Sequence, residues 1–268
     1  MEPRSIAVIG GNGRMGRLFV KLFREAGYPV EVGDRSADQA RLQSLAQHDL
    51  VVLAVPISSM EHITQTLGPW TNPDGATIDI ASVKEGPVRF MLSHCRGEVI
   101  GSHPLFGPRI ETIEGQLVFI CPGRSSKWIS WYRSFLEAQG ATVVDIEPDR
   151  HDRIMAVAQV LRHLVLFSLG GSLTRLEFDL NTELPLSGPW SCQLVGMLKH
   201  HLGQSPELYA ELALHNTHVS RVVEAFRATA NELCSSYTNK DRPAMVKEIG
   251  EIARYFEQRN SDGDNPIS

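Results

Sequence analysis

The sequence has few cysteines, no long run of one charge and few aromatic residues. Its four cysteines are scattered, with no CxxC pair and no histidine at zinc-finger spacing. The formal net charge is -5 without a long basic run, which argues against nucleic acid or an anionic membrane as the main partner. We find no apolar stretch of membrane-spanning length and no signal-peptide pattern. These absences predict a cytoplasmic protein with reduced thiols.

The first half of the chain alternates short apolar runs with helical periodicity. Strands are expected at residues 5–9, 29–33, 50–55, 76–81, 98–102, 117–121 and 142–146. Helices are expected at residues 15–26, 59–67, 88–93 and 127–139. Strands that alternate with helices predict an α/β fold with a doubly wound, parallel, Rossmann-type sheet.

The second half shows almost only helical periodicity. Long helices are expected at residues 152–173, 208–230 and 242–257, with a turn near 184–189 and a polar end, 260–268, that should fray. A chain of 268 residues is long enough for two domains. We therefore predict a dinucleotide-binding domain at 1–148 and an all-helical substrate and dimerisation domain at 149–268. Its apolar helix faces predict a homodimer.

A glycine-rich turn, Gly11-x-Gly13-x-x-Gly16, follows the first expected strand and opens the first expected helix. This context is the one that a dinucleotide-binding fingerprint requires. Gly11 would allow the tight turn, Gly13 would let a pyrophosphate approach the backbone, and Gly16 would let the helix pack against the strand. The free amides of the helix N-terminus would then bind the phosphates.

An acidic residue, Asp34, ends the second expected strand, eighteen residues beyond Gly16. A carboxylate there can accept hydrogen bonds from a ribose and would repel a 2′-phosphate, which favours NAD over NADP. Arg35 leaves NADP open, because an arginine at this place can bind a 2′-phosphate or stack on adenine. The predicted cofactor-binding residues are Gly11, Asn12, Gly13, Arg14, Met15, Gly16, Asp34, Arg35, Val55, Pro56 and Ser82.

Three polar side chains follow two neighbouring expected strands. Ser82 and Lys84 come after the strand at 76–81, and His103 comes after the strand at 98–102. Parallel strands bring their carboxyl ends to one edge of a sheet, where ligands bind. A serine hydroxyl there can orient an imidazole, and the imidazole can accept a proton. Lys84 would add positive charge for an anionic substrate.

Four motifs, in order, resemble those of the prephenate dehydrogenase family. They are GGNGRMG, ASVKEGP, GSHPLFGP and HDRIMAVAQVLRH, and the similarity runs over roughly residues 5–257. The sequence is most similar to the enterobacterial type that is fused to chorismate mutase, although these 268 residues contain no mutase domain. The resemblance implies NAD-dependent oxidative decarboxylation of a cyclohexadienyl acid to an aromatic pyruvate. The reaction needs no metal, because the nicotinamide is the electron sink.

The resemblance also implies roles for single residues. His103 matches the catalytic base or hydrogen-bond acceptor for the C4 hydroxyl, and Ser82 matches the serine that contacts that histidine and the substrate. Lys84 matches the lysine of the same loop. His163 matches a histidine that faces the substrate pocket, with Gln159 one turn earlier; interhelical packing is the other interpretation of both. The pair His151-Asp152 matches a helix start, where Asp152 reads as a capping residue.

The sequence departs from the family at the arginine that binds the substrate's carboxylate. That position holds His218, and Arg221 one turn later is a candidate replacement. A histidine in place of the arginine lacks the permanently charged guanidinium that binds a carboxylate through two hydrogen bonds, so the identity of the substrate is open. The C4 substituent could be a hydroxyl, as in prephenate, which gives 4-hydroxyphenylpyruvate. It could equally be an amine, as in 4-amino-4-deoxyprephenate, which gives 4-aminophenylpyruvate. Arogenate is a third candidate.

Two other classes of function stay open. One is another dehydrogenase of the same architecture, such as a 3-hydroxyacid dehydrogenase, although the long helix at 152–173 lacks the lysine those enzymes use. The other is a non-catalytic NAD-binding protein, which would not need an ordered set of Ser82, Lys84 and His103. The pair His200-His201 could attract a metal, but no carboxylate or cysteine ligands accompany it, so no metal site is predicted.

Overall fold

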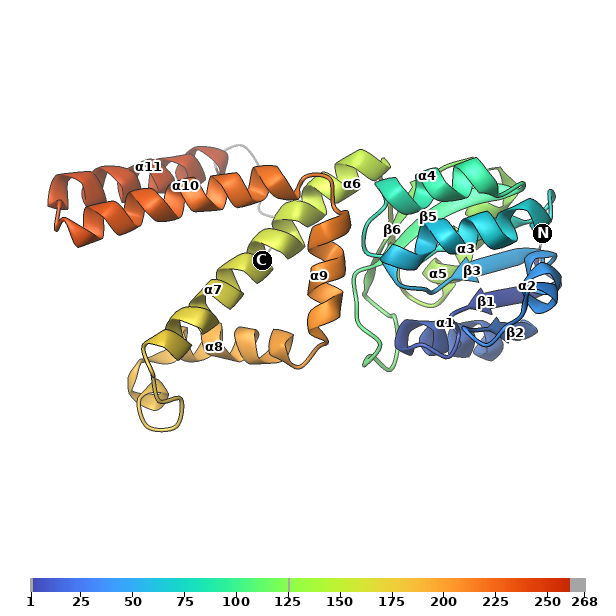
Figure 1. Cartoon of the computed structure of the whole chain (residues 1–268), viewed down its shortest axis with the longest axis horizontal. Helices are drawn as coiled ribbons and strands as arrows, with labels where there is room; N and C mark the ends of the chain where they lie inside the picture. Colours follow the sequence, from blue (N-terminus) through green and yellow to red (C-terminus); the bar gives the residue numbers. More distant parts are fainter. Residues whose placement is uncertain (1, 125, 261–268) are drawn as a thin grey trace. The chain divides into compact units, whose positions relative to one another are not determined.

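The computed structural model of the chain describes residues 2–124 and 126–260. By contacts it divides into two compact units, Met1–Val219 and Ser220–Ser268. The first unit holds the whole sheet and the helices up to α9 (Figure 1). The expected fraying of 261–268 falls outside the described residues. The domain boundary near residue 148 stays a prediction; the last strand ends at Asp145, and the next helix begins at Pro148.

The described residues of the first unit form a seven-stranded sheet in the order β2-β1-β3-β4-β5-β6-β7. The strands are β1 (Ile6–Ile9), β2 (Val30–Gly33), β3 (Leu50–Leu53), β4 (Ala76–Asp79), β5 (Glu98–Pro104), β6 (Leu117–Pro122) and β7 (Thr142–Asp145). The predicted Rossmann-type fold is confirmed, with one correction. The sheet is not wholly parallel, because β6 runs antiparallel to β5. The connection between these two strands contains no helix, so the chain returns directly alongside β5.

Helices cover both faces of the sheet, because the strand residues alternate between two apolar clusters. On one face Ile6 and Val8 pack with Phe19 and Tyr132, which come from α1 (Arg14–Glu25) and α5 (Lys127–Ala138). The other face is covered by α2 (Gln39–Ala46), α3 (Met60–Leu67) and α4 (Glu85–His94). The sequence pattern did not predict α2. It is short and polar, and the Asp38 side chain caps it by accepting the amide of Arg41.

A continuous helix of three segments follows the sheet. It consists of α6 (Pro148–Met155), the π-helical η3 (Ala156–Leu161) and α7 (Arg162–Arg175). Contrary to the sequence-based expectation, Pro148–Arg175 is long and apolar enough to cross a membrane. That result is weak, because a core helix of a water-soluble protein meets the same criteria. This helix also carries the buried polar pair His151 and Asp152.

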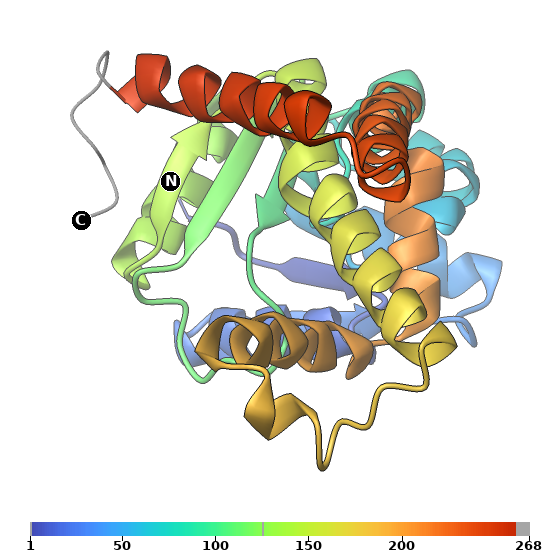
Figure 2. The same cartoon turned by 90° about the vertical axis from the view of Figure 1, so that its left-hand side faces the viewer.

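Two shorter helices, α8 (Pro189–Leu202) and α9 (Pro206–His215), complete the first unit. Figure 2 shows the loop that joins the end of α7 to α8; α8 contacts α7, and α9 contacts η3. Leu212 of α9 packs against Ile57 and Val83, and Glu211 accepts the amide of Ser58 at 2.8 Å. The loops after β3 and β4 are therefore covered by α9.

The helix predicted at 208–230 is wrong as a single element. Asn216 ends α9 in an extended conformation, with ψ of 118°, and α10 (Val219–Thr238) begins three residues later. The break has a physical cause, since the Asn216 side chain bonds outside the helix to the carbonyl of Asp152 at 2.7 Å. The sequence prediction also missed α8.

The second unit consists of most of α10 together with α11 (Arg242–Asn260). Lys240 turns the chain between them with a positive φ of 54°. The Ser236 hydroxyl lies 3.0 Å from the Glu248 carboxylate and joins the two helices. Val246 and Ile249 stay largely exposed, so the chain by itself does not bury the apolar side chains of α11.

Candidate functional site

The glycine-rich turn lies at the switch point of the sheet, where β1 stands between β2 and β3. The positive φ of the turn, 79°, falls on Gly10, and a Cβ on Gly11 would lie 2.8 Å from the Val32 side chain, so both positions favour glycine. A Cβ on Gly10 would lie 2.3 Å from the Ala54 carbonyl, so the turn requires glycine there. A Cβ on Gly16 would lie 2.2 Å from the Gly10 carbonyl oxygen, which confirms that Gly16 lets α1 pack closely against the turn.

The N-terminus of α1 fits an anionic group. Its cap residue, Gly13, has no side chain to accept the helix amides, and the first turn has no acidic residue. A Cβ on Gly13 would meet only the Gly10 carbonyl, at 3.1 Å, so space remains in front of these amides. The turn therefore fits the phosphates of a dinucleotide.

Asp34 lies just beyond β2 and is connected to the turn. Its carboxylate accepts a hydrogen bond from the Asn12 side chain, and Ser36 donates to it from both the amide (2.9 Å) and the hydroxyl (2.7 Å). These bonds, first those from Ser36 and then that from Asn12, lower the pKa of Asp34. An ionised carboxylate at this place suits ribose hydroxyls.

The other predicted cofactor residues border the same edge. Arg14 begins α1 and is exposed, and Met15 is half-buried against the core. Arg35 is exposed just after β2. Val55 and Pro56 follow the end of β3. Their contacts with a cofactor stay predictions.

His103 lies near the end of β5, which extends beyond the last paired residue of β4. Its side chain is only 2% exposed. Its Nδ1 lies 2.8 Å from Nε2 of His151 in α6. No described residue bonds to Nε2 of His103, and this atom is not among the buried polar atoms left without a partner, so it keeps contact with solvent.

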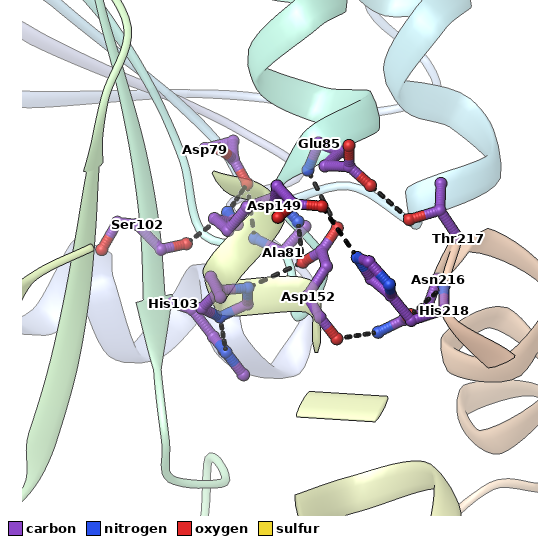
Figure 3. A network of polar contacts seen from close by, with 12 residues as sticks. Asp79, Ala81, Glu85, Ser102, His103, Asp149, Asp152, Asn216, Thr217 and His218 are labelled. Carbon is purple, nitrogen blue, oxygen red and sulfur yellow. Dashed lines mark hydrogen bonds and ion pairs between the residues drawn. The ribbon is translucent and has the colours of Figure 1, made fainter. Parts of the chain in front are cut away.

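Asp152 connects this histidine pair to the start of α4 (Figure 3). Its carboxylate lies 2.7 Å from Nδ1 of His151 and accepts the backbone amides of Lys84 at 2.7 Å and Glu85 at 3.0 Å. Asp152 is therefore a capping residue. The sequence suggested that it caps its own helix, but it caps α4 instead. The role of His151 was missed, since only tertiary structure brings residue 151 to residue 103.

Both imidazoles are held neutral. Burial, followed by the nearby His151 and Lys84, lowers the pKa of His103 well below its usual range. Burial also lowers the pKa of His151, although Asp152 opposes this effect. Near neutral pH, His103 is thus an uncharged imidazole that can accept a proton.

Ser82 lies in the loop after β4, as predicted, and is half-buried. The hydrogen bond expected between Ser82 and His103 is absent among the described residues, and His151 holds the imidazole instead. The alternation of side chains along β5 explains why His103 contacts His151. Successive side chains of β5 point to opposite faces, and His103 lies on the face that α6 covers.

Lys84 does not lie where an anionic substrate could reach it, which corrects the prediction from sequence. Its side chain is fully buried, its ammonium pairs with the Asp79 carboxylate, and it also donates to the carbonyl of Ser102. A buried lysine needs such partners. The carboxylate at the end of β4 therefore draws the ammonium inward.

His163 lies in an aromatic cluster between α7, α8 and α9. Its ring centroid is 4.7 Å from that of Tyr209, 5.3 Å from His201 and 6.0 Å from Phe167. Burial, with Arg162 and His201 adding to it, lowers the pKa of His163 to about 4. Gln159 lies on the π-helical η3 and is half-buried. Contact of either residue with a substrate stays a prediction.

His218 follows the break after α9. Its Nε2 lies 3.0 Å from the Asp149 carboxylate, and Glu85 also has a ligand atom within 4.8 Å of theirs. These three groups could hold a metal ion, although Asp149 is exposed. His218, which the resemblance matches to the family's arginine, thus lies beside two carboxylates. Arg221 belongs to the second unit, so its predicted contact with a substrate stays a prediction.

Comparisons with known proteins agree with this arrangement. Residues 21–145 match the family model described as prephenate dehydrogenase, nucleotide-binding domain, and residues 147–251 match prephenate dehydrogenase, dimerization domain. A probable arogenate/prephenate dehydrogenase of Methanocaldococcus jannaschii is 29% identical; the match covers 94% of this chain and 61% of that protein. The T-protein of Haemophilus influenzae is 30% identical, with 95% and 68% covered.

Two further proteins are similar. A 4-amino-4-deoxyprephenate dehydrogenase of Streptomyces pristinaespiralis is 25% identical, with 78% of this chain and 76% of that protein covered. The crystal structure of prephenate dehydrogenase from A. aeolicus, in complex with hydroxyphenyl propionate and NAD⁺, is 20% identical. It superposes with a TM-score of 0.75 over 96% of this chain and 99% of that one. The two family models and the fold agree, and the chain belongs to the prephenate dehydrogenase family.

Proposed function

We propose that this protein catalyses the NAD-dependent oxidative decarboxylation of a prephenate-type cyclohexadienyl acid to an aromatic pyruvate. The observation that carries the proposal is the environment of His103. One ring nitrogen is held by His151, and the other, Nε2, has no partner among the described residues. The ring stays neutral near pH 7. A buried, neutral imidazole with one free nitrogen is the group that a proton transfer requires.

The turn that Gly10, Gly13 and Gly16 form would hold NAD, which when bound would supply the hydride acceptor for C4 of the ring. The amides at the start of α1 would hold its pyrophosphate, and the Asp34 carboxylate would accept hydrogen bonds from its adenosine ribose. Asn12 donates to Asp34 and keeps the carboxylate beside the turn.

His103 accepts the proton from the heteroatom on C4 of the substrate. The proton moves to Nε2, because Nδ1 is already engaged with His151. Loss of the ring carboxylate as carbon dioxide makes the ring aromatic, which drives the reaction forward. We propose that the substrate-binding site is lined by Ser82, Gln159 and His163, as the family resemblance implies.

Replacement of His103 by Asn tests the role of the imidazole. We expect the dissociation constant for NAD to stay within about two-fold, while turnover of the preferred substrate falls by about 10²–10⁴-fold, the usual range for a lost general base. Binding is measured by titration calorimetry, and turnover by the absorbance of NADH. Turnover near that of the unmodified protein would contradict the role of His103, and no turnover of any cyclohexadienyl acid by the unmodified protein would contradict the function.

A substrate that carries an ammonium group, 4-amino-4-deoxyprephenate or arogenate, is a second candidate, and the surroundings of His218 favour it. Asp149 and Glu85 place two carboxylates where the family carries a cation. Such a site attracts an ammonium more readily than a carboxylate. Purified protein should be assayed with prephenate, arogenate and 4-amino-4-deoxyprephenate. A higher kcat/KM for either amine than for prephenate supports this candidate, and efficient turnover of prephenate alone rules it out.

We also propose that the protein is a homodimer through its helical part. Trp190, Leu194 and Met197 are exposed along α8 at a spacing that places them on one side of the helix. Phe167 and Phe178, with Val195 and Leu198 of α8, help to line an apolar groove of about 460 Å³. A second copy would cover such surfaces. Light scattering after gel filtration should give twice the mass of 29.7 kDa, and a monomer would contradict the proposal.

A further inference from the structure

The chain Asp152–His151–His103 is continuous and buried (Figure 3). Asp152 lies 2.7 Å from Nδ1 of His151, and Nε2 of His151 lies 2.8 Å from Nδ1 of His103. The His151 ring is further fixed by an edge-on contact with Phe119, at 5.5 Å between ring centroids. The two rings are therefore fixed relative to one another.

The position of each hydrogen follows from the acceptor at one end. The Asp152 carboxylate already accepts the amides of Lys84 and Glu85, so Nδ1 of His151 donates to it. In a neutral imidazole the other nitrogen then accepts, so Nδ1 of His103 donates to Nε2 of His151. The remaining nitrogen of His103, Nε2, carries the free lone pair.

We propose that His151 and Asp152 are positioning residues that hold His103 in the Nδ1–H tautomer, with the lone pair of Nε2 available to the substrate. The inference rests on the proposed function of His103. When Nε2 takes the substrate's proton, one N–H bond forms on His103 and one bond to hydrogen breaks on the C4 heteroatom. No proton needs to move between the two rings, and Asp152 balances the positive charge through His151.

Two variants of His151 separate positioning from packing. His151→Phe keeps an aromatic ring but removes both nitrogens. In His151→Gln the amide oxygen can accept from His103, while the amide NH₂ can donate to Asp152. We expect kcat to fall roughly 10–100-fold in His151→Phe, with KM and the NAD dissociation constant within about two-fold, and to recover to within a few-fold in His151→Gln. Equal losses of kcat in both variants, or unchanged kcat in His151→Phe, would overturn the proposal.

A spectroscopic readout tests the tautomer without activity. Long-range ¹H–¹⁵N spectra of the full chain, without ligand, distinguish a protonated from an unprotonated ring nitrogen. The signals of His103 are assigned by their loss in His103→Asn. We expect Nδ1 to be protonated in the unmodified protein, and a mixture of tautomers in His151→Phe. A predominantly Nε2-protonated His103 in the unmodified protein would overturn the inference, even where His151→Phe fails to fold. Because the spectra need no substrate, they decide the inference separately from the proposed function.

Discussion

The ammonium of Lys84 pairs with the carboxylate of Asp79, and both side chains are fully buried. Lys84 also donates to the carbonyl of Ser102, so one side chain connects the end of β4 with β5. Burial raises the pKa of Asp79, and the adjacent ammonium opposes this effect. The pair anchors the loop that carries Ser82 and leads into α4.

Lys84→Met should destabilise the fold, because it leaves the Asp79 carboxyl group buried without its partner. We expect a loss of about 3–5 kcal/mol in the free energy of unfolding, measured with urea. The double variant Lys84→Met with Asp79→Asn should recover part of this loss, because neither position then carries a buried charge without its partner. If Lys84→Met instead leaves the stability unchanged and raises KM for the substrate, Lys84 contacts the substrate, as the sequence suggested.

Gly13→Ala should weaken NAD binding without unfolding the protein. Gly13 has φ of -69° and ψ of 167°, which alanine adopts readily, but a methyl group there would keep a pyrophosphate from approaching the backbone closely. We expect the dissociation constant for NAD to rise roughly 10-fold, with only a small loss of stability because the added Cβ would lie 3.1 Å from the Gly10 carbonyl oxygen. Gly196→Ala is the matched control, because nothing lies within 4 Å of its Cβ in α8. Equal NAD affinity in both variants would show that the phosphates bind elsewhere.

The stability of the protein should fall as the pH drops below 6.5. Folding lowers the pKa of His163 from 6.5 to about 4, so the unfolded chain takes up its proton first. The contribution of His163 is fully present above pH 6.5 and is lost between pH 6.5 and about 4. A shift of this size corresponds to up to about 3 kcal/mol.

Urea unfolding at pH 7.5 and pH 5 measures this loss, and His163→Gln supplies the control. The variant should lose less stability between the two pH values, since His103 and His151 still contribute but residue 163 no longer titrates. An identical pH dependence in variant and unmodified protein would show that His163 stays easy to protonate in the fold.

His218→Arg should shift selectivity toward substrates that depend on their carboxylate. The arginine would pair with Asp149 and offset the negative charge that Asp149 and Glu85 place there. We expect KM for prephenate to fall roughly 10-fold, the size of one hydrogen bond between charged groups, and KM for the amine to rise. Asp149→Asn, which removes one negative charge without adding a guanidinium, is the comparison. The same KM values as in the unmodified protein would place residue 218 away from the substrate.

The sequence by itself determined the elements whose cause is local. The alternation of apolar runs with helices predicted the Rossmann-type sheet, and the spacing of Gly11, Gly13 and Gly16 located the nucleotide-binding turn. The motif around His103 pointed to the end of β5 because strand ends at one sheet edge follow from chain direction alone. These features depend on residues within a few positions of one another.

Tertiary structure alone decided which groups contact one another. His151 meets His103 across 48 residues, and Asn216 breaks the predicted helix because it bonds to Asp152 across 64 residues. Lys84, in the loop after β4, turns inward because its ammonium pairs with the carboxylate of Asp79 at the end of that strand. Each contact offsets the free-energy cost of burying its polar groups, and burial is set by the packing of distant segments, which no local pattern records.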